Sequence, residues 1–234
     1  MSSDNVTLSI EQRVALIRLD DGKANALSPE TITHLSGVLD EAEENAGAVV
    51  LTGREGRFSG GFDLSVMMSG SDAARGLVTS GAELLIRLYS FPLPVTVACT
   101  GHAVAAGALL LLAADTRIGV RGAFKIGLNE VAIGMRLPVF AATLASERLS
   151  KRHFTAATQL ARLYDPEAAV DAGYLDRVVD AEVLIEEALG EAERWAALPR
   201  PAFRGSRKVL RGAVVESMRA TLAGDMAGVE APDR

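Results

Sequence analysis

Residues 95–114 read VTVACTGHAVAAGALLLLAA. The segment Val95 to Cys99 predicts a strand, a turn is expected at Gly101, and the small and apolar residues from Ala105 onward predict a helix buried in the core. The apolar run ends at Asp115, well short of the roughly 20 residues that a membrane-spanning helix needs. This stretch therefore predicts a strand that turns directly into a core helix.

Strands and helices alternate on both sides of this stretch. Ser28 followed by Pro29 is typical of a helix N-terminus, and two alternating apolar segments before it predict a hairpin. Such alternation predicts βαβ units and a largely parallel sheet covered by helices. The expected strands are 6–10, 14–19, 48–51, 95–99, 116–120 and 124–126, the expected helices begin at 29, 73 and 105, and from 137 the pattern is nearly all helical, with a break at 166 and a short apolar return at 175–179.

The last part of the chain differs in character. The sequence Leu198-Pro199-Arg200-Pro201 interrupts a long Glu/Ala-rich helix, and a further amphipathic helix is expected from about Phe203. We therefore expect an α/β core over residues 1–198 and a helical segment over residues 199–234. This segment packs either on its own domain or on a neighbouring subunit.

The composition is that of an ordinary globular chain, with 234 residues of which 49% are hydrophobic and 23% charged. A net charge of -6, a pI near 5.2 and scattered Lys and Arg residues disfavour nucleic-acid binding. The single cysteine, Cys99, is expected in a buried strand, and the N-terminus has no basic or apolar region of a secretory signal. We expect a cytoplasmic protein that binds neither nucleic acids nor membranes.

The segment Gly60-Gly61-Phe62-Asp63-Leu64 follows a predicted strand and opens a helix, so its backbone amides lack helical partners. This pattern is typical either of an anion site or of a tight turn that needs positive φ at glycine. Asp63 is expected to cap or brace the turn.

The segment Gly101 to Gly107 is a second strand-to-helix turn built of small residues, which either admit a ligand to the backbone or only allow tight helix packing. Two such helix starts together would supply converging amides.

The third segment, Asn129 to Gly134, places Glu130 in apolar sequence. Loss of solvent there would raise the pKa of Glu130 and suit it to proton exchange near neutrality. The alternative is a strand-end glutamate that faces water or pairs with Arg136. No spacing of His, Cys, Asp or Glu predicts a metal site, and no dinucleotide or Walker motif is present.

In this order and spacing, the segments resemble those of the crotonase (enoyl-CoA hydratase/isomerase) superfamily. The similarity runs from about Val6 to Val179. The matching segments are Asp21–Leu27 (the N-terminal loop), Phe58–Leu64 and Gly101–Asp115 (the two oxyanion segments) and Asn129–Gly134 (the catalytic turn). The resemblance implies an α/β crotonase-like spiral of repeated ββα units with a C-terminal helical appendage, assembled as a homotrimer or dimer of trimers. It also implies an acyl-CoA thioester substrate and no cofactor beyond the CoA of that substrate.

The resemblance assigns the catalytic role to Glu130 and the oxyanion hole to the backbone N–H groups of Phe62 and Ala106. Each such donor contributes on the order of 3 kcal/mol to stabilising an enolate. Here Lys23 is either a cation for the CoA phosphates or a solvated lysine. His102 either lines the acyl pocket or hydrogen-bonds a substrate, or it is a packed or solvent-facing histidine. The residues that the resemblance places at the substrate are Lys23, Ala24, Gly60, Gly61, Asp63, His102, Gly107 and Leu109.

One departure from the family pattern concerns Leu109, where hydratases of the family carry a second glutamate. Hydration requires a held water and a proton donor, whereas moving a double bond needs one base. The sequence therefore favours Δ3,Δ2-enoyl-CoA isomerisation by Glu130 alone. The alternatives are an enoyl-CoA hydratase, another enolate-forming enzyme such as a thioester or C–C bond hydrolase, and a non-catalytic acyl-CoA-binding protein.

Overall fold

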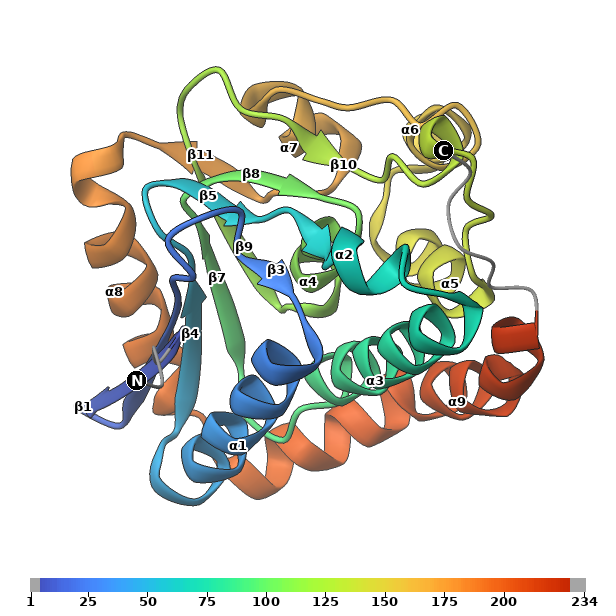
Figure 1. Ribbon diagram of the computed structural model, residues 1–234. Coiled ribbons are helices and arrows are strands. Elements are labelled where there is room, and N and C mark those ends of the chain that lie inside the picture. Colours follow the sequence, from blue (N-terminus) through green and yellow to red (C-terminus); the bar gives the residue numbers. More distant parts are fainter. Residues whose placement is uncertain (1–4, 228–234) are drawn as a thin grey trace.

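The computed structural model describes residues 5–227, and its centre is a six-stranded sheet with the order β1-β2-β4-β7-β9-β11 (Figure 1). β1 and β2 form the expected antiparallel hairpin, and all later neighbours in the sheet run parallel. The predicted largely parallel sheet is confirmed. Its strands are β1 Val6–Glu11, β2 Val14–Leu19, β4 Ala48–Thr52, β7 Val95–Cys99, β9 Thr116–Val120 and β11 Arg177–Val179.

The central strands β4 and β7 are buried at every residue because helices cover both faces of the sheet. Successive side chains of a strand point to opposite faces, so Val49 and Leu51 join the cluster under α1, α3 and α4, whereas Val50 joins the cluster under α8. The helices that make these layers are α1 Pro29–Asn45, α3 Ser71–Tyr89, α4 Ala106–Ala113 and α8 Leu184–Ala196.

A second, smaller sheet runs above the first with the order β10-β8-β5, and all its neighbours are parallel. Each of its strands follows a strand of the main sheet and leads into a helical segment, which confirms the expected repetition of ββα units. The bounds are β5 Gly56–Ser59, β8 Gly101–Val104 and β10 Ile126–Gly127, and a separate parallel pair joins β3 Ala26–Leu27 to β6 Gly61–Phe62.

The prediction of a turn at Gly101 and a helix from Ala105 was wrong in one respect. Residues Gly101–Val104 form strand β8, and the helix α4 begins at Ala106. Pairing of β8 with β5 and β10 overrides the weak local preference of small residues.

The other helices follow the predicted signals closely. Ser28 caps α1 through its hydroxyl, which accepts the Thr31 amide (3.1 Å), and Pro166 opens α7 rather than only breaking a helix. The remaining bounds are α2 Leu64–Met67, α5 Val139–Arg148, α6 Lys151–Thr158, α7 Pro166–Ala172 and α9 Arg200–Ala227, with 3₁₀ turns at Val131–Ile133 and Ala181–Val183. α9 thus begins at Arg200, a few residues before the position expected.

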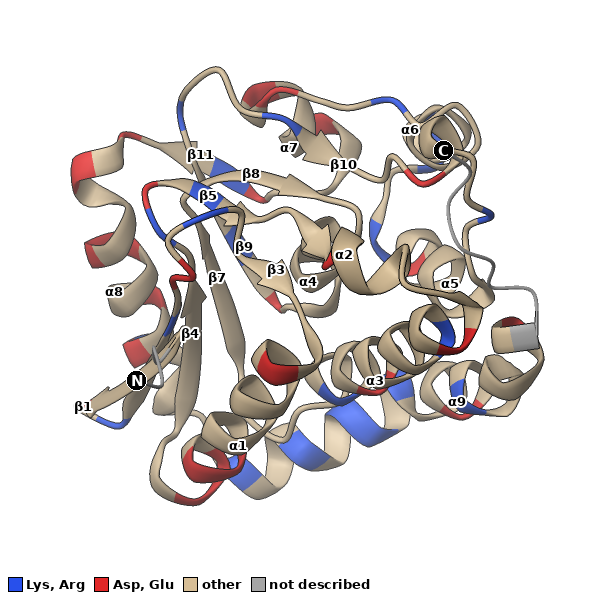
Figure 2. Ribbon diagram, viewed as in Figure 1, with Lys and Arg blue, Asp and Glu red and all other residues tan. Residues whose placement is uncertain are grey.

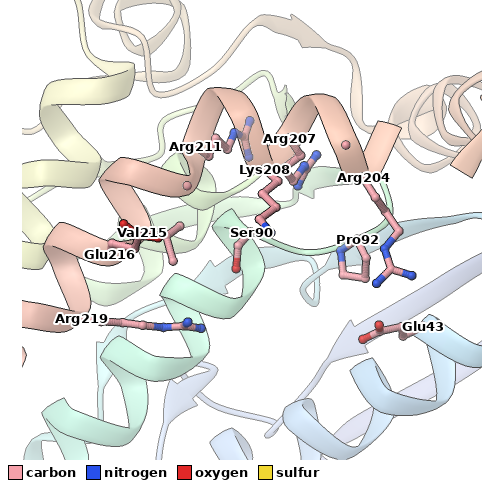
Figure 3. Close-up of a pocket in the computed structure, with 12 residues that line it drawn as sticks. Glu43, Ser90, Pro92, Arg204, Arg207, Lys208, Arg211, Val215, Glu216 and Arg219 are labelled. Atoms are coloured by element: carbon pink, nitrogen blue, oxygen red, sulfur yellow. The ribbon is translucent and has the colours of Figure 1, made fainter. Parts of the chain in front are cut away.

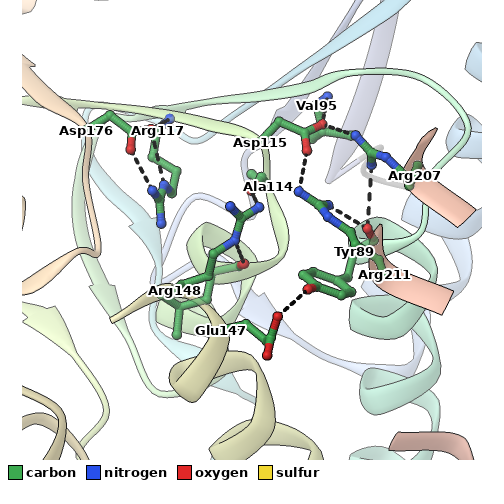
Figure 4. Close-up of polar contacts among 11 residues, drawn as sticks. Tyr89, Val95, Ala114, Asp115, Arg117, Glu147, Arg148, Asp176, Arg207 and Arg211 are labelled. Atoms are coloured by element: carbon green, nitrogen blue, oxygen red, sulfur yellow. Dashed lines mark hydrogen bonds and ion pairs between the residues drawn. The ribbon is translucent and has the colours of Figure 1, made fainter. Parts of the chain in front are cut away.

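The tail helix α9 packs on α3 and α5 of its own chain. A cluster of charged residues at the C-terminal end of α4 binds α9 to the core (Figure 4). The Asp115 carboxylate accepts hydrogen bonds from Arg207 Nη2 (2.5 Å) and Arg211 Nη2 (2.8 Å), and Arg211 also donates to the Tyr89 carbonyl (2.7 Å). Arg148 donates to the carbonyls of Leu112 and Ala114 at the C-terminal end of α4. The helix dipole makes this end negative, so a cation there is stabilised.

Charge is distributed less evenly than the sequence indicated. Lys and Arg gather along α9, whereas acidic residues are prominent on α8 (Figure 2). Two of the arginines on α9 are already paired with Asp115. Among residues 5–227, no helix is long and apolar enough to cross a membrane, and the apolar residues just before Asp115 form the fully buried helix α4.

Candidate functional site

Glu130 lies just after β10, where the chain enters a short 3₁₀ turn. Its carbonyl accepts the amides of Ile133 (3.1 Å) and Met135 (2.9 Å), which closes the turn around it. The side chain is 9% exposed, and its Oε2 atom has no hydrogen-bond partner among the described residues. Burial raises the pKa of Glu130 to about 7, with its own amide and that of Asn129 acting in the opposite direction.

The alternative of a water-facing glutamate paired with Arg136 is wrong. Arg136 Nη2 lies 3.7 Å from the buried carboxylate of Asp225 on α9 and donates to the Asp225 carbonyl. Glu130 is thus free to act as a base on a molecule that reaches the turn.

The first oxyanion segment forms strand β6 and the start of α2. The Asp63 amide donates to the Leu27 carbonyl (3.2 Å), so in this parallel pair the Phe62 amide points away from β3. Asp63 caps α2 by accepting the Ser65 amide (2.8 Å), and hydrogen bonds from Ser65 lower the pKa of Asp63. The expectation that Asp63 braces its turn is confirmed.

The second oxyanion segment turns sharply at Ala105. Ala105 has φ 52°, an uncommon value for a residue with a side chain, and its amide donates to the Gly127 carbonyl (3.0 Å). Ala106 follows as the first residue of α4, so its amide has no carbonyl one turn earlier in the helix. The Ala106 amide therefore needs an acceptor from outside the helix.

The two oxyanion segments contact each other at Gly61 and Gly107, where there is no room for a side chain. A Cβ atom on Gly61 (φ 93°) would lie 2.9 Å from the Ala105 Cβ and 3.2 Å from the Ala106 amide nitrogen. A Cβ atom on Gly107 would lie 2.3 Å from the Ser59 carbonyl oxygen. Both positions require glycine, and the close approach brings the Phe62 and Ala106 segments side by side, as a pair of converging donors requires.

Sequence reasoning missed the residue that accommodates the large Phe62 side chain. A Cβ atom on Gly81 of α3 would lie 2.1 Å from Phe62 Cε1 and 2.4 Å from Cζ. The aromatic ring therefore occupies the space that any side chain at Gly81 would fill. The sequence did carry a signal for this contact, because a glycine in the middle of an apolar helix face often marks a close approach by another residue.

The N-terminal loop supports the first oxyanion segment through its backbone. The Ala24 carbonyl accepts the Gly60 amide (2.8 Å), and Arg54 Nε donates to the Lys23 carbonyl (2.8 Å), while the Lys23 side chain is exposed. The buried Asn25, which sequence reasoning also missed, donates to the carbonyls of Leu19 (2.8 Å) and Phe58 (3.2 Å). Lys23 and Ala24 thus lie beside the site.

His102 lies on β8 and contacts two residues of the loop before β10. Its Nδ1 accepts the Lys125 amide (3.0 Å), and its ring packs edge-on to Phe124 with centroids 5.4 Å apart. Burial lowers the pKa of His102, and Arg57 and Lys125 add to the effect. His102 is thus the packed histidine that was one of the expected alternatives.

Leu109 is 2% exposed on α4, one turn beyond the Ala106 amide, and no residue of α4 carries a carboxylate. Cys99 is buried, and burial raises the pKa of its thiol to about 12, which confirms the unreactive strand cysteine expected. In the part of the chain that the structure describes, no three His, Cys, Asp or Glu side chains gather as metal ligands would.

A groove of about 520 Å³ lies elsewhere, between α9 and the ends of α1 and α3 (Figure 3). Arginines and one lysine of α9 line it together with Glu43, Ser90 and Pro92, whereas Glu130 and the residues of the two oxyanion segments do not. It is therefore separate from the Glu130 site.

Comparison with known proteins identifies the family of this chain. A family model described as enoyl-CoA hydratase/isomerase matches residues 9–230. The human mitochondrial enoyl-CoA delta isomerase 1 is 30% identical over 210 residues, which cover 88% of this chain and 70% of the human protein. A probable enoyl-CoA hydratase of Bacillus subtilis is 32% identical over 200 residues, covering 82% and 76%.

Among solved structures, an enoyl-CoA hydratase/isomerase family protein from Pseudomonas syringae superposes with a TM-score of 0.95 at 42% identity, covering 97% of this chain and 99% of the other. An enoyl-CoA isomerase of Mycobacterium tuberculosis gives a TM-score of 0.91 at 38% identity, covering 96% and 99%. Isomerases and hydratases both occur among these relatives. The chain belongs to the enoyl-CoA hydratase/isomerase family, within the crotonase superfamily.

Proposed function

We propose that this protein is a Δ3,Δ2-enoyl-CoA isomerase that uses Glu130 as its single acid–base group. The observation that carries the proposal is the pairing of one buried carboxylate, whose pKa is raised to about 7, with a leucine at the position of the second hydratase glutamate. A base with a pKa near the working pH is largely ionised and is still basic enough to remove a proton from the substrate.

In the proposed reaction, the Glu130 carboxylate removes a proton from C2 of a 3-enoyl thioester. The electron pair moves toward the thioester oxygen, and the resulting dienolate accepts hydrogen bonds from the Phe62 and Ala106 amides. Glu130 then returns the proton at C4, which yields the 2-enoyl thioester without consuming water or any other reactant. Lys23 and the backbone around Ala24, Gly60 and Gly61 are the proposed contacts of the CoA part, and CoA enters as part of the substrate.

Hydration is the second candidate, because a probable enoyl-CoA hydratase is as similar to this chain as the human isomerase. Water addition needs one group to orient the water and another to protonate the product. Leu109 provides neither, which favours isomerisation. We also propose, from family resemblance, assembly as a homotrimer or dimer of trimers, and, from the single cysteine and the N-terminal sequence, a cytoplasmic location.

The test is a paired assay of the purified protein on a 3-enoyl-CoA and on a 2-enoyl-CoA, with product analysis, repeated with Glu130→Gln. Conversion of the 3-enoyl substrate that is lost in the variant, with negligible hydration, is the expected result. Turnover that survives in Glu130→Gln contradicts the assignment of the base. Inactivity on both substrates shifts the proposal to a hydrolase or to a binding protein, which hydrolysis of acyl-CoA and equilibrium binding of an acyl-CoA then separate.

A further inference from the structure

The turn that carries Glu130 has few contacts of its own that could hold it in place. None of the three residues of its 3₁₀ helix, Val131–Ile133, is buried, and Gly134 ends the turn in the left-handed region at φ 78°. A base must nevertheless lie within about 3–3.5 Å of the atom from which it takes a proton. The position of the Glu130 carboxylate therefore depends on what holds the two ends of this turn.

The first end is held by a strand. Ile126 of β10 exchanges both backbone hydrogen bonds with Tyr164 (2.9 Å each), and β10 pairs with β8. After the turn, the Met135 amide donates to the Glu130 carbonyl (2.9 Å), and the chain then runs without regular structure to the start of α5. Among the described residues, no carbonyl accepts the amides of residues 136–137, so this connection needs support from elsewhere.

The second end is held by a residue of the tail helix. The buried Asp225 carboxylate of α9 accepts the Phe140 amide through Oδ2 (3.2 Å), and its Oδ1 lies 3.7 Å from Arg136 Nη2. The same Arg136 nitrogen donates to the Asp225 carbonyl (3.3 Å). Arg136 directly follows Met135, whose amide closes the turn onto Glu130. Asp225 thus contacts the connection between the catalytic turn and α5 at both of its ends.

The sequence explains why an acceptor is needed here. The N-cap position of α5 is Pro138, which has no side-chain oxygen to accept the free amides of the first helical turn. Asp225 accepts one of them from 85 residues further along the chain, and its negative charge is favourable at the positive end of the helix dipole. The Asp225 side chain is only 1% exposed, and its partners among the described residues lie in segment 136–140. Its buried charge is therefore stabilised only while this segment keeps its path.

The end of α9 that carries Asp225 is itself anchored. It packs on α5, as Figure 1 shows, and the neighbouring Met226 belongs to the hydrophobic core. We propose that Asp225 is a positioning residue for Glu130, through which the tail helix sets where the base lies. Asp225 acts through Arg136 and the start of α5 and does not touch the substrate. The inference rests on the proposed function in taking Glu130 as the base.

The first test compares kcat and KM for a 3-enoyl-CoA. Asp225→Ala removes the acceptor and should lower kcat by about 10-fold to 100-fold, because a displacement of about 1 Å is enough to slow proton transfer that much. KM should change by less than about 2-fold, since the interaction that is lost matters in the transition state and not in binding. Asp225→Asn keeps an oxygen for the Phe140 amide and should retain kcat to within about 3-fold.

Asp115→Ala is the control for a merely structural role. Asp115 holds the same helix through Arg207 and Arg211, in the N-terminal half of α9. Under conditions in which urea unfolding shows this variant to be folded, it should keep the kcat of the natural chain. Equal kcat losses in Asp115→Ala and Asp225→Ala overturn the positioning role, because loosening of α9 alone would then explain both.

Hydrogen–deuterium exchange of the protein without substrate measures the turn itself. In the peptide of residues 129–137, Asp225→Ala should speed exchange at the amides bonded to the Glu130 carbonyl by about 10-fold or more, and Asp115→Ala should leave it unchanged. Arg136→Gln, at a side chain that is 57% exposed, gives a second measurement should Asp225→Ala fail to fold. It should speed the same exchange by about 3-fold, because only one of the contacts is lost.

The two measurements separate the inference from the proposed function. Unchanged exchange in Asp225→Ala and Arg136→Gln overturns the inference and leaves the isomerase proposal standing, as does faster exchange with an unchanged kcat in an active enzyme. Faster exchange in a protein without isomerase activity keeps Asp225 as the support of the turn and rejects the proposed reaction.

Discussion

The ring of Phe62 lies directly against the backbone of Gly81, so that a Cβ atom at residue 81 would stand 2.1 Å from the ring. Phe62 belongs to β6, and its amide is one of the two proposed oxyanion donors. Gly81 belongs to α3, the helix that packs over that segment. The Phe62 amide can therefore keep its position only because residue 81 of α3 has no side chain.

Gly81→Ala should therefore lower kcat/KM for a 3-enoyl-CoA by about 10-fold to 100-fold, because the ring and its backbone must shift and an oxyanion donor is worth roughly 3 kcal/mol. Gly76→Ala, on the same helix but with nothing within 4 Å of the added Cβ, is the matched control. It should keep full activity and raise stability by about 0.5–1 kcal/mol. Steady-state kinetics and thermal unfolding of both variants check this, and equal activity in the two would contradict the link.

The pH dependence of activity should follow the ionisation of Glu130. The base acts in its charged form, and burial raises its pKa to about 7. We expect kcat/KM to rise as pH increases toward 7 and to level off above it. A profile that instead levels off near pH 4.5, the ordinary value for a glutamate, would show that Glu130 is solvated when it acts.

The same carboxyl should make the folded state less stable as pH rises. Its pKa is about 7 in the folded state and ordinarily 4.5, as in the unfolded chain, so between these values the folded state holds more protons than the unfolded state. The free energy of unfolding therefore falls over this window, by up to about 3 kcal/mol. Urea unfolding at pH 5 and pH 8 should show this loss in the natural chain and not in Glu130→Gln.

The sequence predicted the parts of the site that depend on local signals. Glycines at 60 and 61, small residues ahead of a buried helix and a glutamate in apolar sequence indicate the proposed oxyanion segments and the proposed base. Asn25 and Gly81 were missed, because each acts through a contact with residues far away along the chain. Asn25 donates to a carbonyl 33 residues later, and Gly81 matters only because Phe62 reaches it.

The same distinction explains the errors in the fold. Strand β8 has only four residues, three of them small, and is defined by its pairing with β5 and β10, so no local pattern separates it from the start of the next helix. The main strands were predicted well because runs such as Val95–Cys99 are buried on both faces and carry a continuous apolar signal.

Leu109→Glu should introduce hydration of a 2-enoyl-CoA, because it restores a second carboxylate one turn beyond the Ala106 amide. Leu109 is 2% exposed, so the change should also cost a few kcal/mol of folding stability when the carboxylate is charged. Leu109→Gln is similar in size but cannot exchange protons, and it should give no hydration. Assays of both variants on the same 2-enoyl-CoA check this; equal hydration by the two would mean that the second carboxylate is not what limits the reaction.

Asp115→Ala should destabilise the fold by about 3–5 kcal/mol, because Arg207 and Arg211 would keep their charges in a largely buried place without a partner. Asp115 also accepts the Val95 amide (2.9 Å), so its loss frees a sheet strand and the tail helix together. Asp72→Ala is the control, since its ion pair with Arg75 is exposed and should contribute less than about 1 kcal/mol. Urea unfolding of both variants at pH 7 measures the difference, and a small loss in Asp115→Ala would mean that apolar contacts alone hold α9 on α3 and α5.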